Sequence, residues 1–298
     1  MDQIGSDGEK FSRRKFLGGA LASFLVALGV GKRFSGKKGD SEMNRAPVFF
    51  VGHGSPMNAI GENEFTKGWA ASVQNLPRPK AILCISAHWV TRGSRITAME
   101  SPKTIHDFYG FPQELFDVQY SAPGNPALAK EISTDSRTQR LDLDYEWGLD
   151  HGSWSVLRHM YPNADIPVLQ LSLDATKPAG WHYEFAKELA SLRDQNTLIV
   201  GSGDLVHNLR LYNWRNEEEI PDWSKEANET FKALILKRDS KALSQYQNLG
   251  TAAQLAVPTP EHYIPMLYAL ALAGENEEIS FYNDKIQSTV SMTSFRIG

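Results

Sequence analysis

Histidine is the residue type that offers this chain the most chemistry. Six of the eight histidines stand in local settings that suggest a working side chain. Neutral imidazole binds Fe, Zn, Cu and Ni, and histidine is also the side chain whose proton moves most readily near neutral pH. The six candidates are His53, His88, His106, His151, His207 and His262.

Three of the candidates follow apolar runs that read as buried strands. His53 stands in Gly-His-Gly-Ser-Pro, where the flanking glycines permit a sharp turn and the close approach of a ligand. His88 and His207 come at or shortly after the ends of two further runs. Ligands of open α/β sheets bind outside the carboxyl ends of the strands, so we expect these rings to converge there.

A single histidine at a strand end is more often a hydrogen-bonded structural residue than a metal ligand, and this alternative stays open for each position. Several histidines that converge are harder to dismiss. We expect His262 in the first turn of a helix, with Thr259 as its cap and Pro260 at its start. His159 and His182 lack such a context, and we expect both to be structural.

The remaining motifs restrict the chemistry. The chain has one cysteine, Cys84, so an intrachain disulfide, a cysteine-based zinc finger and an iron–sulfur site are excluded. Glycine-rich nucleotide loops, a nucleophile elbow and a His-Glu-x-x-His zinc motif are absent from the sequence. A bound metal would therefore need imidazole and oxygen ligands.

The body of the chain has the pattern of an α/β protein. Continuous apolar runs rich in Val and Ile predict strands that are buried on both faces, and helical spacing of apolar residues falls between them. We expect one domain with three αβα layers around a central, mostly parallel sheet. The expected strands are 47–51, 81–86, 166–173, 197–201, 279–282 and 289–297, and the expected helices are 181–193, 223–237 and 261–273.

The first 42 residues have a different character. Paired arginines in 12–15, a short apolar run and a basic end resemble a twin-arginine export signal, and 35–42 reads as a linker. We therefore expect residues 1–42 to be a signal and linker, and residues 43–298 to form the catalytic domain. The protein would use the twin-arginine export machinery and be periplasmic or exported. An alternative that stays open is that the signal is not cleaved and tethers the protein to the membrane.

The charge separates along the same boundary. Residues 1–42 carry eight basic and five acidic side chains, a net charge of +3, whereas the remainder carries 23 basic and 30 acidic side chains, a net charge of −7. An acidic body is a poor surface for nucleic acid, so no nucleic-acid partner is expected. The oligomeric state cannot be read from these patterns.

Seven motifs in one order resemble those of the LigB-type class III extradiol ring-cleavage dioxygenases, in the 4,5-DOPA dioxygenase branch. The resemblance runs from about Pro47 to the end of the chain. The motifs are 52–57, 86–89, 104–108, 110–112, 150–154, 202–209 and 259–263.

The resemblance implies a mononuclear non-haem metal site. His53 and His88 match two of its ligands, and His262 matches the third, which is a glutamate in the best-known catechol-cleaving relatives. This exchange leaves the site more positive by one charge. Fe(2+) is implied for activity, and Zn(2+) is possible in the same place.

Three further histidines take roles by the same resemblance. His207 matches the acid/base histidine, and it could become a fourth ligand in a zinc-loaded form. His151 matches a histidine that contacts substrate and acts in catalysis. His106 matches a motif near the mouth of the substrate pocket.

The activity implied by the resemblance is the insertion of both atoms of O2 into a catechol-type, DOPA-like aromatic to give a ring-opened semialdehyde. Two alternatives remain: a zinc-dependent hydrolase and a non-catalytic relative that keeps the fold. We expect carboxylate bases to be scarce near the histidines, which argues against the hydrolase, and Asp204 and Glu261 are the leading candidates for such a base. Aromatic residues flank the motifs and could hold a catechol ring: Trp89, Phe108, Tyr109, Phe111 and Trp154.

Overall fold

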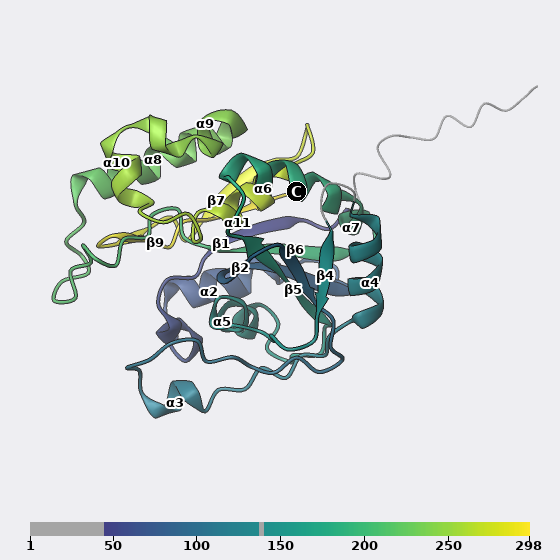
Figure 1. The fold of residues 1–298 in the computed structure, drawn as a ribbon. Helices are drawn as coiled ribbons and strands as arrows, with labels where there is room; N and C mark the ends of the chain where they lie inside the picture. Colours follow the sequence, from purple (N-terminus) through teal and green to yellow (C-terminus); the bar gives the residue numbers. More distant parts are fainter. Residues whose placement is uncertain (1–44, 137–139) are drawn as a thin grey trace, which may run out of the picture. The chain divides into compact units, whose positions relative to one another are not determined.

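A computed structural model describes residues 45–136 and 140–298 of the chain (Figure 1). These described residues belong to one compact unit. The expected signal and linker, 1–42, lie outside the described residues. Within the described ranges, every helix is too short or too polar to cross a membrane.

The described strands form an eight-stranded sheet in the order β4-β3-β5-β2-β6-β1-β10-β7, with a two-stranded sheet of β8 and β9 beside it. The central pairs β5–β2, β2–β6 and β6–β1 are parallel, and β10 and β7 extend the sheet in antiparallel pairing. The strands are β1 (Val48–Gly52), β2 (Ala81–Thr91), β3 (Ser94–Thr97), β4 (Leu141–Asp144), β5 (Val168–Asp174), β6 (Thr197–Gly203), β7 (Ile279–Tyr282), β8 (Ile286–Gln287), β9 (Val290–Ser291) and β10 (Ser294–Ile297).

The described helices connect and cover these strands. The α-helices are α2 (Glu64–Val73), α3 (Gln113–Phe116), α4 (Pro126–Asp135), α5 (His151–Met160), α6 (Ala179–Ala186), α7 (Ala190–Asp194), α8 (Asp222–Leu236), α9 (Ser240–Ser244), α10 (Thr251–Ala256) and α11 (Ile264–Ala271). The 3-10 helices are η1 (Pro56–Ala59), η2 (Lys187–Leu189) and η3 (Tyr246–Leu249).

The central strands are apolar throughout because each of their faces is covered. In β1, Val48 and Phe50 pack into one core, and Phe49 and Val51 pack into a second core on the opposite face. This alternation follows from the two-residue repeat of a strand. Side chains from α4, α6 and α11 complete the first core, and side chains from α2 and α5 complete the second. The predicted three-layer αβα fold is confirmed.

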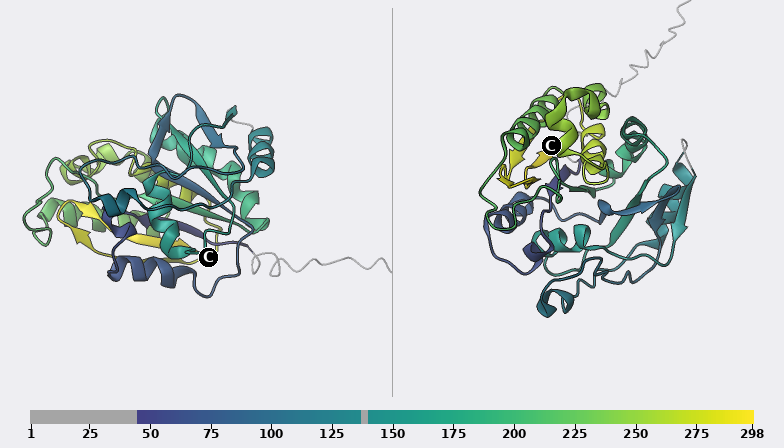
Figure 2. Two further views of the ribbon diagram at one scale, coloured as in Figure 1. Left: turned by 90° about the horizontal axis from the view of Figure 1, so that it is seen from below. Right: turned by 60° about the vertical axis from the view of Figure 1, so that its left-hand side comes forward.

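The helices on the first face extend beyond the sheet. Helices α8, α9 and α10 (green) group beside the C-terminal strands (yellow) in Figures 1 and 2. Hydrogen bonds join the two groups, since Ser224 donates to the carbonyl of Ser288 and the hydroxyl of Ser291 donates to the side-chain oxygen of Asn228. The chain between β6 and α11 is thereby fixed to the C-terminal segment.

Most of the expected elements are confirmed, with some changed boundaries. The expected helix 181–193 is divided into α6, η2 and α7, and the expected last strand is divided into β9 and β10. The expected helix start at residues 259–261 is wrong: α11 begins at Ile264, and residues before it form a turn. Pro265 stands in the first turn of α11. Proline is favoured there because the backbone N–H groups of a helix's first turn have no partner within the helix, so the N–H that proline lacks is not missed.

The course of β2 also differs from the expectation that it ends at Ser86. Ser86 is its last residue paired with β6, but the strand continues to Thr91 in pairing with β5 after a shift of register between Ile85 and Val90. His88 lies in this irregular stretch and not at a strand end. Register irregularities of this kind re-aim side chains next to functional sites.

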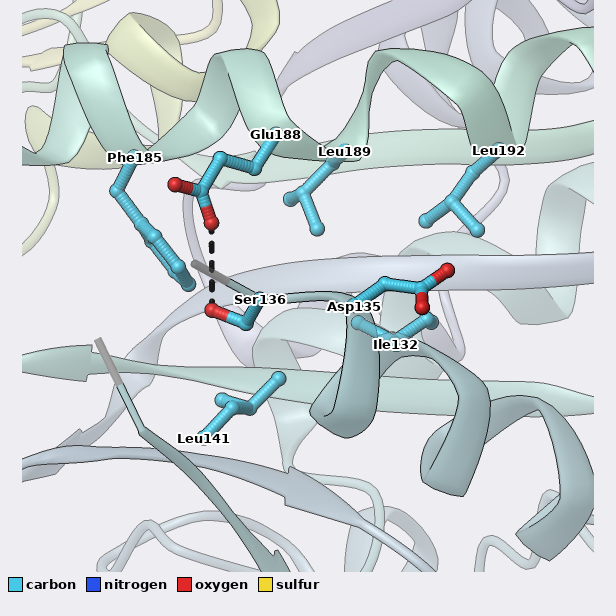
Figure 3. A pocket seen from close by; sticks show the side chains of 8 residues that line it. All are labelled: Ile132, Asp135, Ser136, Leu141, Phe185, Glu188, Leu189 and Leu192. Atoms are coloured by element: carbon cyan, nitrogen blue, oxygen red, sulfur yellow. Dashed lines mark hydrogen bonds between the residues drawn. The ribbon is translucent and has the colours of Figure 1, made fainter. Parts of the chain in front are cut away.

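Two hollows among the described residues lie away from the histidines. The smaller, between α4 and the α6–α7 segment (Figure 3), measures about 20 Å³, room for about one water molecule. In it Ser136 donates to Glu188, 3.3 Å away. The larger, about 500 Å³, lies by the amino ends of β2 and β6, where Lys80 and Asn196 line it. Neither contains a candidate site residue.

Candidate metal centre

Three of the predicted ligands meet at the carboxyl end of the sheet. Donor atoms of His53, His88 and His262 lie within 4.8 Å of one another. The Nε2 atoms of His53 and His88 are 3.2 Å apart, and the ring centre of His262 is 5.3 Å from that of His53 and 5.0 Å from that of His88. His53 and His262 are buried and His88 is partly buried. The fold therefore brings together imidazoles from three distant parts of the chain.

Hydrogen bonds fix which nitrogen of His53 faces the others. Ser202 donates its only hydroxyl proton to the carbonyl of Gly152 at 2.5 Å. The Nδ1 atom of His53 lies 3.0 Å from the same hydroxyl oxygen, so Nδ1 must carry the proton and donate it. The Nε2 atom of His53 is left with a free lone pair.

Carboxylates have the same effect on the other two rings. Nδ1 of His88 lies 3.4 Å from Asp107, and Nδ1 of His262 lies 3.4 Å from Glu261. Since a carboxylate only accepts, these contacts favour the proton on Nδ1 of each ring and a lone pair on each Nε2. A carboxylate behind a histidine is the usual partner of a metal-binding imidazole.

The chemistry of this donor set fits a cation. With the protons of His53 and His88 on Nδ1, their Nε2 atoms, 3.2 Å apart, repel each other unless a positive charge lies between them. Two ligands of one ion with bonds of about 2.1 Å stand about 3.0–3.4 Å apart. The residues His53, His88 and His262 therefore fit a bound metal ion, and their assignment as its ligands stays a prediction.

Burial keeps these rings neutral. Desolvation lowers the pKa of His53 and of His262 well below the ordinary value, and the neighbouring imidazoles lower both further. Desolvation together with His151 lowers the pKa of His88 to about 3, although Asp107 opposes the shift. Neutral imidazole is the form that binds metal.

His207 lies flat against His262. Their ring centres are 3.5 Å apart and their planes differ by 9°. The lone pairs of the two rings lie in nearly parallel planes, and a nitrogen of each ring lies within 4.8 Å of the other and of an Asp204 oxygen. Burial lowers the pKa of His207 to about 4, below the near-neutral value that suits an acid/base residue. Its predicted roles as base and as fourth ligand stay predictions.

His151 is held by a residue that the sequence did not single out. Asp107 accepts from the backbone N–H of His151 at 2.9 Å and lies 3.0 Å from its Nδ1. The ring centre of His151 is 3.9 Å from that of His88. Although burial opposes ionisation of Asp107, its hydrogen bonds with His151 and its electrostatic interactions with His151 and His88 hold the pKa of Asp107 below the ordinary value. Its place next to His106 in a quoted motif was the only signal.

A buried scaffold holds these elements together. Asp150 caps α5, accepts from Ser86 at 2.7 Å and from Gln170 at 2.6 Å, and thereby ties β2, β5 and the start of α5. Gly203 permits the close approach of the turn before α11, because a Cβ atom at Gly203 would lie 2.1 Å from the carbonyl oxygen of His262.

Carboxylates do lie beside the imidazoles, so their expected scarcity is wrong. Asp107 and Glu261 accompany His88 and His262, and Asp204 lies with its Oδ2 atom 3.5 Å from Nε2 of His53. Burial raises the pKa of Asp204 well above the ordinary value, and backbone bonds from Gly54 and His53 oppose the shift.

The flanking aromatic residues differ in where they lie: some pack in the interior, one lies beside a histidine of the cluster, and one is exposed. Trp154 is buried and donates its indole N–H to the carbonyl of Ile105, and Trp89 stacks on Trp147. Phe108 makes an edge contact with His151 at 5.6 Å between ring centres, and Phe111 packs behind it. Tyr109 is 92% exposed. Of the five expected residues, Phe108 is the one placed beside an imidazole of the cluster.

The remaining histidines stand apart from the metal group. His106 lies 3.0 Å from the carbonyl of Val118 and packs on Trp154 and Phe108, so its predicted substrate contact stays a prediction. His159 lies 2.8 Å from the carbonyl of Asn58, and His182 lies 3.0 Å from the hydroxyl of Tyr268. The latter two have structural partners, as expected.

Comparison with known proteins identifies the family. Residues 47–294 match the family described as the catalytic LigB subunit of aromatic ring-opening dioxygenase. The chain belongs to the LigB family. Family and relatives' names together support enzyme status as an extradiol dioxygenase.

Relatives cover nearly the whole body of the chain. A protein of Escherichia coli K12 named 4,5-DOPA dioxygenase extradiol is 46% identical over 85% of this chain and 95% of its own length. A Beta vulgaris protein of the same name is 36% identical over 80% of this chain and 91% of its own length. The crystal structure of an uncharacterized protein from E. coli K12 is 41% identical, covers 85% of this chain and 100% of that chain, and gives a TM-score of 0.75.

Proposed function

We propose that this LigB-family protein is a metal-dependent extradiol dioxygenase that cleaves a catechol-type, DOPA-like aromatic. In this reaction the carbon–carbon bond of the ring beside the diol breaks, both atoms of O2 are incorporated into the product, and the product is a ring-opened semialdehyde. The observation that carries the proposal is the convergence of ring nitrogens from His53, His88 and His262 at the carboxyl end of the sheet. Membership of a family of ring-opening dioxygenases supports it.

The chain would divide the work between metal binding and proton transfer. A redox-active cation such as Fe(2+), when bound, supplies positions for a diol and O2 and carries electron density between them. His207, neutral because burial lowers its pKa to about 4, has a ring nitrogen free to accept a proton from a substrate hydroxyl. Once charged, it is a strong acid that returns the proton to a product oxygen.

His151 and Phe108 would place the substrate ring. Since Asp107 accepts the Nδ1 proton of His151, the Nε2 atom of His151 is left as an acceptor for a substrate hydroxyl. Phe108 stands edge-on to His151 and presents an apolar surface for an aromatic ring.

The test is anaerobic loading with Fe(2+), followed by a catechol and then air. We expect consumption of one O2 per catechol and a yellow ring-opened product. A zinc-loaded sample serves as the control, because zinc holds the site without redox chemistry. Catechol that remains intact in the iron-loaded protein would contradict the proposal.

The zinc hydrolase alternative has a specific observation in its favour. Asp107, Asp204 and Glu261 lie close enough to the imidazoles to activate a water. Ester or amide hydrolysis by the zinc-loaded protein that a chelator abolishes would support this reading. No hydrolase is among the relatives compared above, so the dioxygenase is the better-supported function.

The side chain of the catechol can be tested with a matched series. The relatives named above are DOPA dioxygenases by name, and a DOPA carboxylate would need a cationic partner in this chain. Arg92, Lys103 and Arg210 lie near the motifs. Comparing kcat/KM for DOPA, dopamine and catechol separates the contributions of the carboxylate and the amine. Equal values for all three would contradict a DOPA-like substrate.

We also propose export by the twin-arginine route. The paired arginines Arg13 and Arg14, the short apolar run and the basic end support it. Replacing both arginines with lysine should leave the protein in the cytoplasmic fraction, whereas the unchanged chain should reach the periplasm. Equal distribution of the two proteins would contradict this route.

A further inference from the structure

The loop formed by residues 106–118 brings one aromatic ring to the imidazole cluster and leaves its tip in solvent. Phe108 stands edge-on to His151, with 5.6 Å between the ring centres. The next residue, Tyr109, is 92% exposed, and a Cβ atom added at Gly110 would meet none of the described atoms within 4 Å. These two tip residues do not hold Phe108 in place, so its position is set by other parts of the loop.

Hydrogen bonds close the base of this loop. Nε2 of His106 lies 3.0 Å from the carbonyl oxygen of Val118, and because a carbonyl only accepts, Nε2 carries the proton and donates it. Beside this bond, the backbone N–H of Tyr120 donates to the hydroxyl of Thr104 at 3.0 Å. The side chain of His106 therefore joins two ends of the loop that are 12 positions apart in the chain.

The imidazole of His106 also packs among three other rings. Its centre lies 5.5 Å from that of Trp154, 5.8 Å from that of Phe108 and 6.0 Å from that of Phe116. Trp154 is buried and donates its indole N–H to the carbonyl of Ile105, so it presents a fixed surface. A His106 ring held by this surface and by its hydrogen bond in turn fixes the Phe108 ring that packs on it.

The other rings that contact Phe108 do not replace this support. Phe111 and Phe116 lie with their centres 5.3 Å and 5.0 Å from that of Phe108, but both belong to the same loop. They keep their places only if the loop keeps its course. Trp154, outside the loop, is farther from Phe108, at 6.2 Å.

We propose that His106 is a positioning residue, which through its bond to Val118 holds Phe108 where the ring of an aromatic substrate binds. The inference rests on the proposed function, because it concerns the wall of the same substrate site. It gives His106 an action through Phe108, whereas the sequence predicts a direct contact with the substrate. A fixed aromatic wall favours an aromatic ligand through edge or stacked contacts.

The test measures the binding of 4-nitrocatechol to the zinc-loaded protein, in which no redox turnover occurs. His106→Phe keeps an aromatic ring but loses the donor, and His106→Leu replaces it if that variant does not fold. His106→Gln keeps an N–H donor near the position of Nε2. The control is His159→Phe, because His159 lies in the same way 2.8 Å from a backbone carbonyl, that of Asn58, but outside the loop.

We expect the affinity for 4-nitrocatechol to fall about 3–10-fold in His106→Phe, and the backbone amides of residues 107–117 to exchange with solvent faster by a similar factor, because one hydrogen bond is lost. Zinc content should equal that of the wild type. His106→Gln and His159→Phe should both keep the wild-type affinity for 4-nitrocatechol.

Wild-type affinity for 4-nitrocatechol in a folded His106→Phe protein would overturn the inference alone. Weaker binding without faster exchange in the loop would also overturn it, because His106 would then act on the ligand directly, and so would a His106→Gln protein that binds as weakly as His106→Phe. A wild-type zinc protein that binds no 4-nitrocatechol would overturn the inference and the proposed function together. Normal binding without ring cleavage after iron loading would count only against the proposed function.

Discussion

The two ends of the central sheet both bury charged or polar groups, but they satisfy them differently. Near the amino ends of β1 and β6, the fully buried Arg193 donates to the carbonyls of Ala46 and Leu272 and to both oxygens of Glu277. At the carboxyl ends, the Nε2 atoms of His53 and His88 face each other at 3.2 Å, while their Nδ1 atoms face Ser202 and Asp107.

This difference distinguishes buried polar groups that stabilise the fold from buried polar groups that are available to bind a ligand. A buried group whose hydrogen bonds are complete stabilises the fold and has nothing left to offer a ligand. A group with a free lone pair costs stability unless something binds it, which is why such groups gather at functional sites. By this criterion the Arg193–Glu277 end is structural and the imidazole end is a binding site.

The largest expected effect is on turnover at the imidazole end. His207→Ala should lower turnover by about 10²–10⁴-fold, because a positioned acid/base residue contributes that much. Bound metal, measured by elemental analysis, should stay at the wild-type level because His53, His88 and His262 remain. Undiminished turnover would remove His207 from the mechanism.

The second-largest expected effect is on stability, at the end of the sheet that holds the Arg193–Glu277 ion pair. Glu277→Gln leaves the buried Arg193 without its counter-charge, which should lower the free energy of unfolding by about 3–5 kcal/mol. Denaturant unfolding measures this loss. Metal content at low temperature should equal that of the wild type, and a variant that loses metal while it stays folded would break the separation of the two ends.

The pH dependence of stability should report the neutral imidazoles. In the folded, metal-free protein burial lowers the pKa of His88 to about 3 and of His207 to about 4, whereas an unfolded histidine titrates near 6.5. Between these values the unfolded chain binds more protons, so the free energy of unfolding falls as the pH falls from about 6.5 towards 4.

His207→Ala removes one of these protonation sites and serves as the comparison protein. Its loss of stability over the same pH range should be smaller than that of the wild type by about 2–3 kcal/mol. Denaturant midpoints at a series of pH values give the measurement. Identical slopes for the two proteins would show that His207 is not held neutral by the fold.

The smallest expected effect concerns the residue that orients two rings. Asp107→Asn should weaken metal binding by about 10–100-fold, because the carboxylate that fixes the Nδ1 protons of His88 and His151 is lost. Competition with a chelator measures the affinity. Glu114→Gln, on the surface helix α3, is the matched control, and equal affinities in both variants would contradict the role of Asp107.

The sequence predicted the centre of the fold well, and for a physical reason. Strands such as β1 and β6 are buried on both faces, so their apolar runs are continuous and visible without any partner. His53 directly after β1 was found in the same way. Short edge strands such as β4, with the alternating residues of 141–144, have no such run and were missed.

The parts that depend on distant contacts could not be predicted. The continuation of β2 past Ser86 depends on pairing with β5, and His88 is aimed by that change of register. The partnership of Asp107 with His88 and His151 joins three separate motifs. The turn that presents His262 depends on its packing against Gly203.

The most direct test of the central claim is an anomalous diffraction map of the zinc-loaded protein, recorded at the zinc edge. The account predicts one strong peak at about 2.0–2.1 Å from the Nε2 atoms of His53, His88 and His262. A map with no peak among these three rings, or with the ion held elsewhere on the chain, would contradict it.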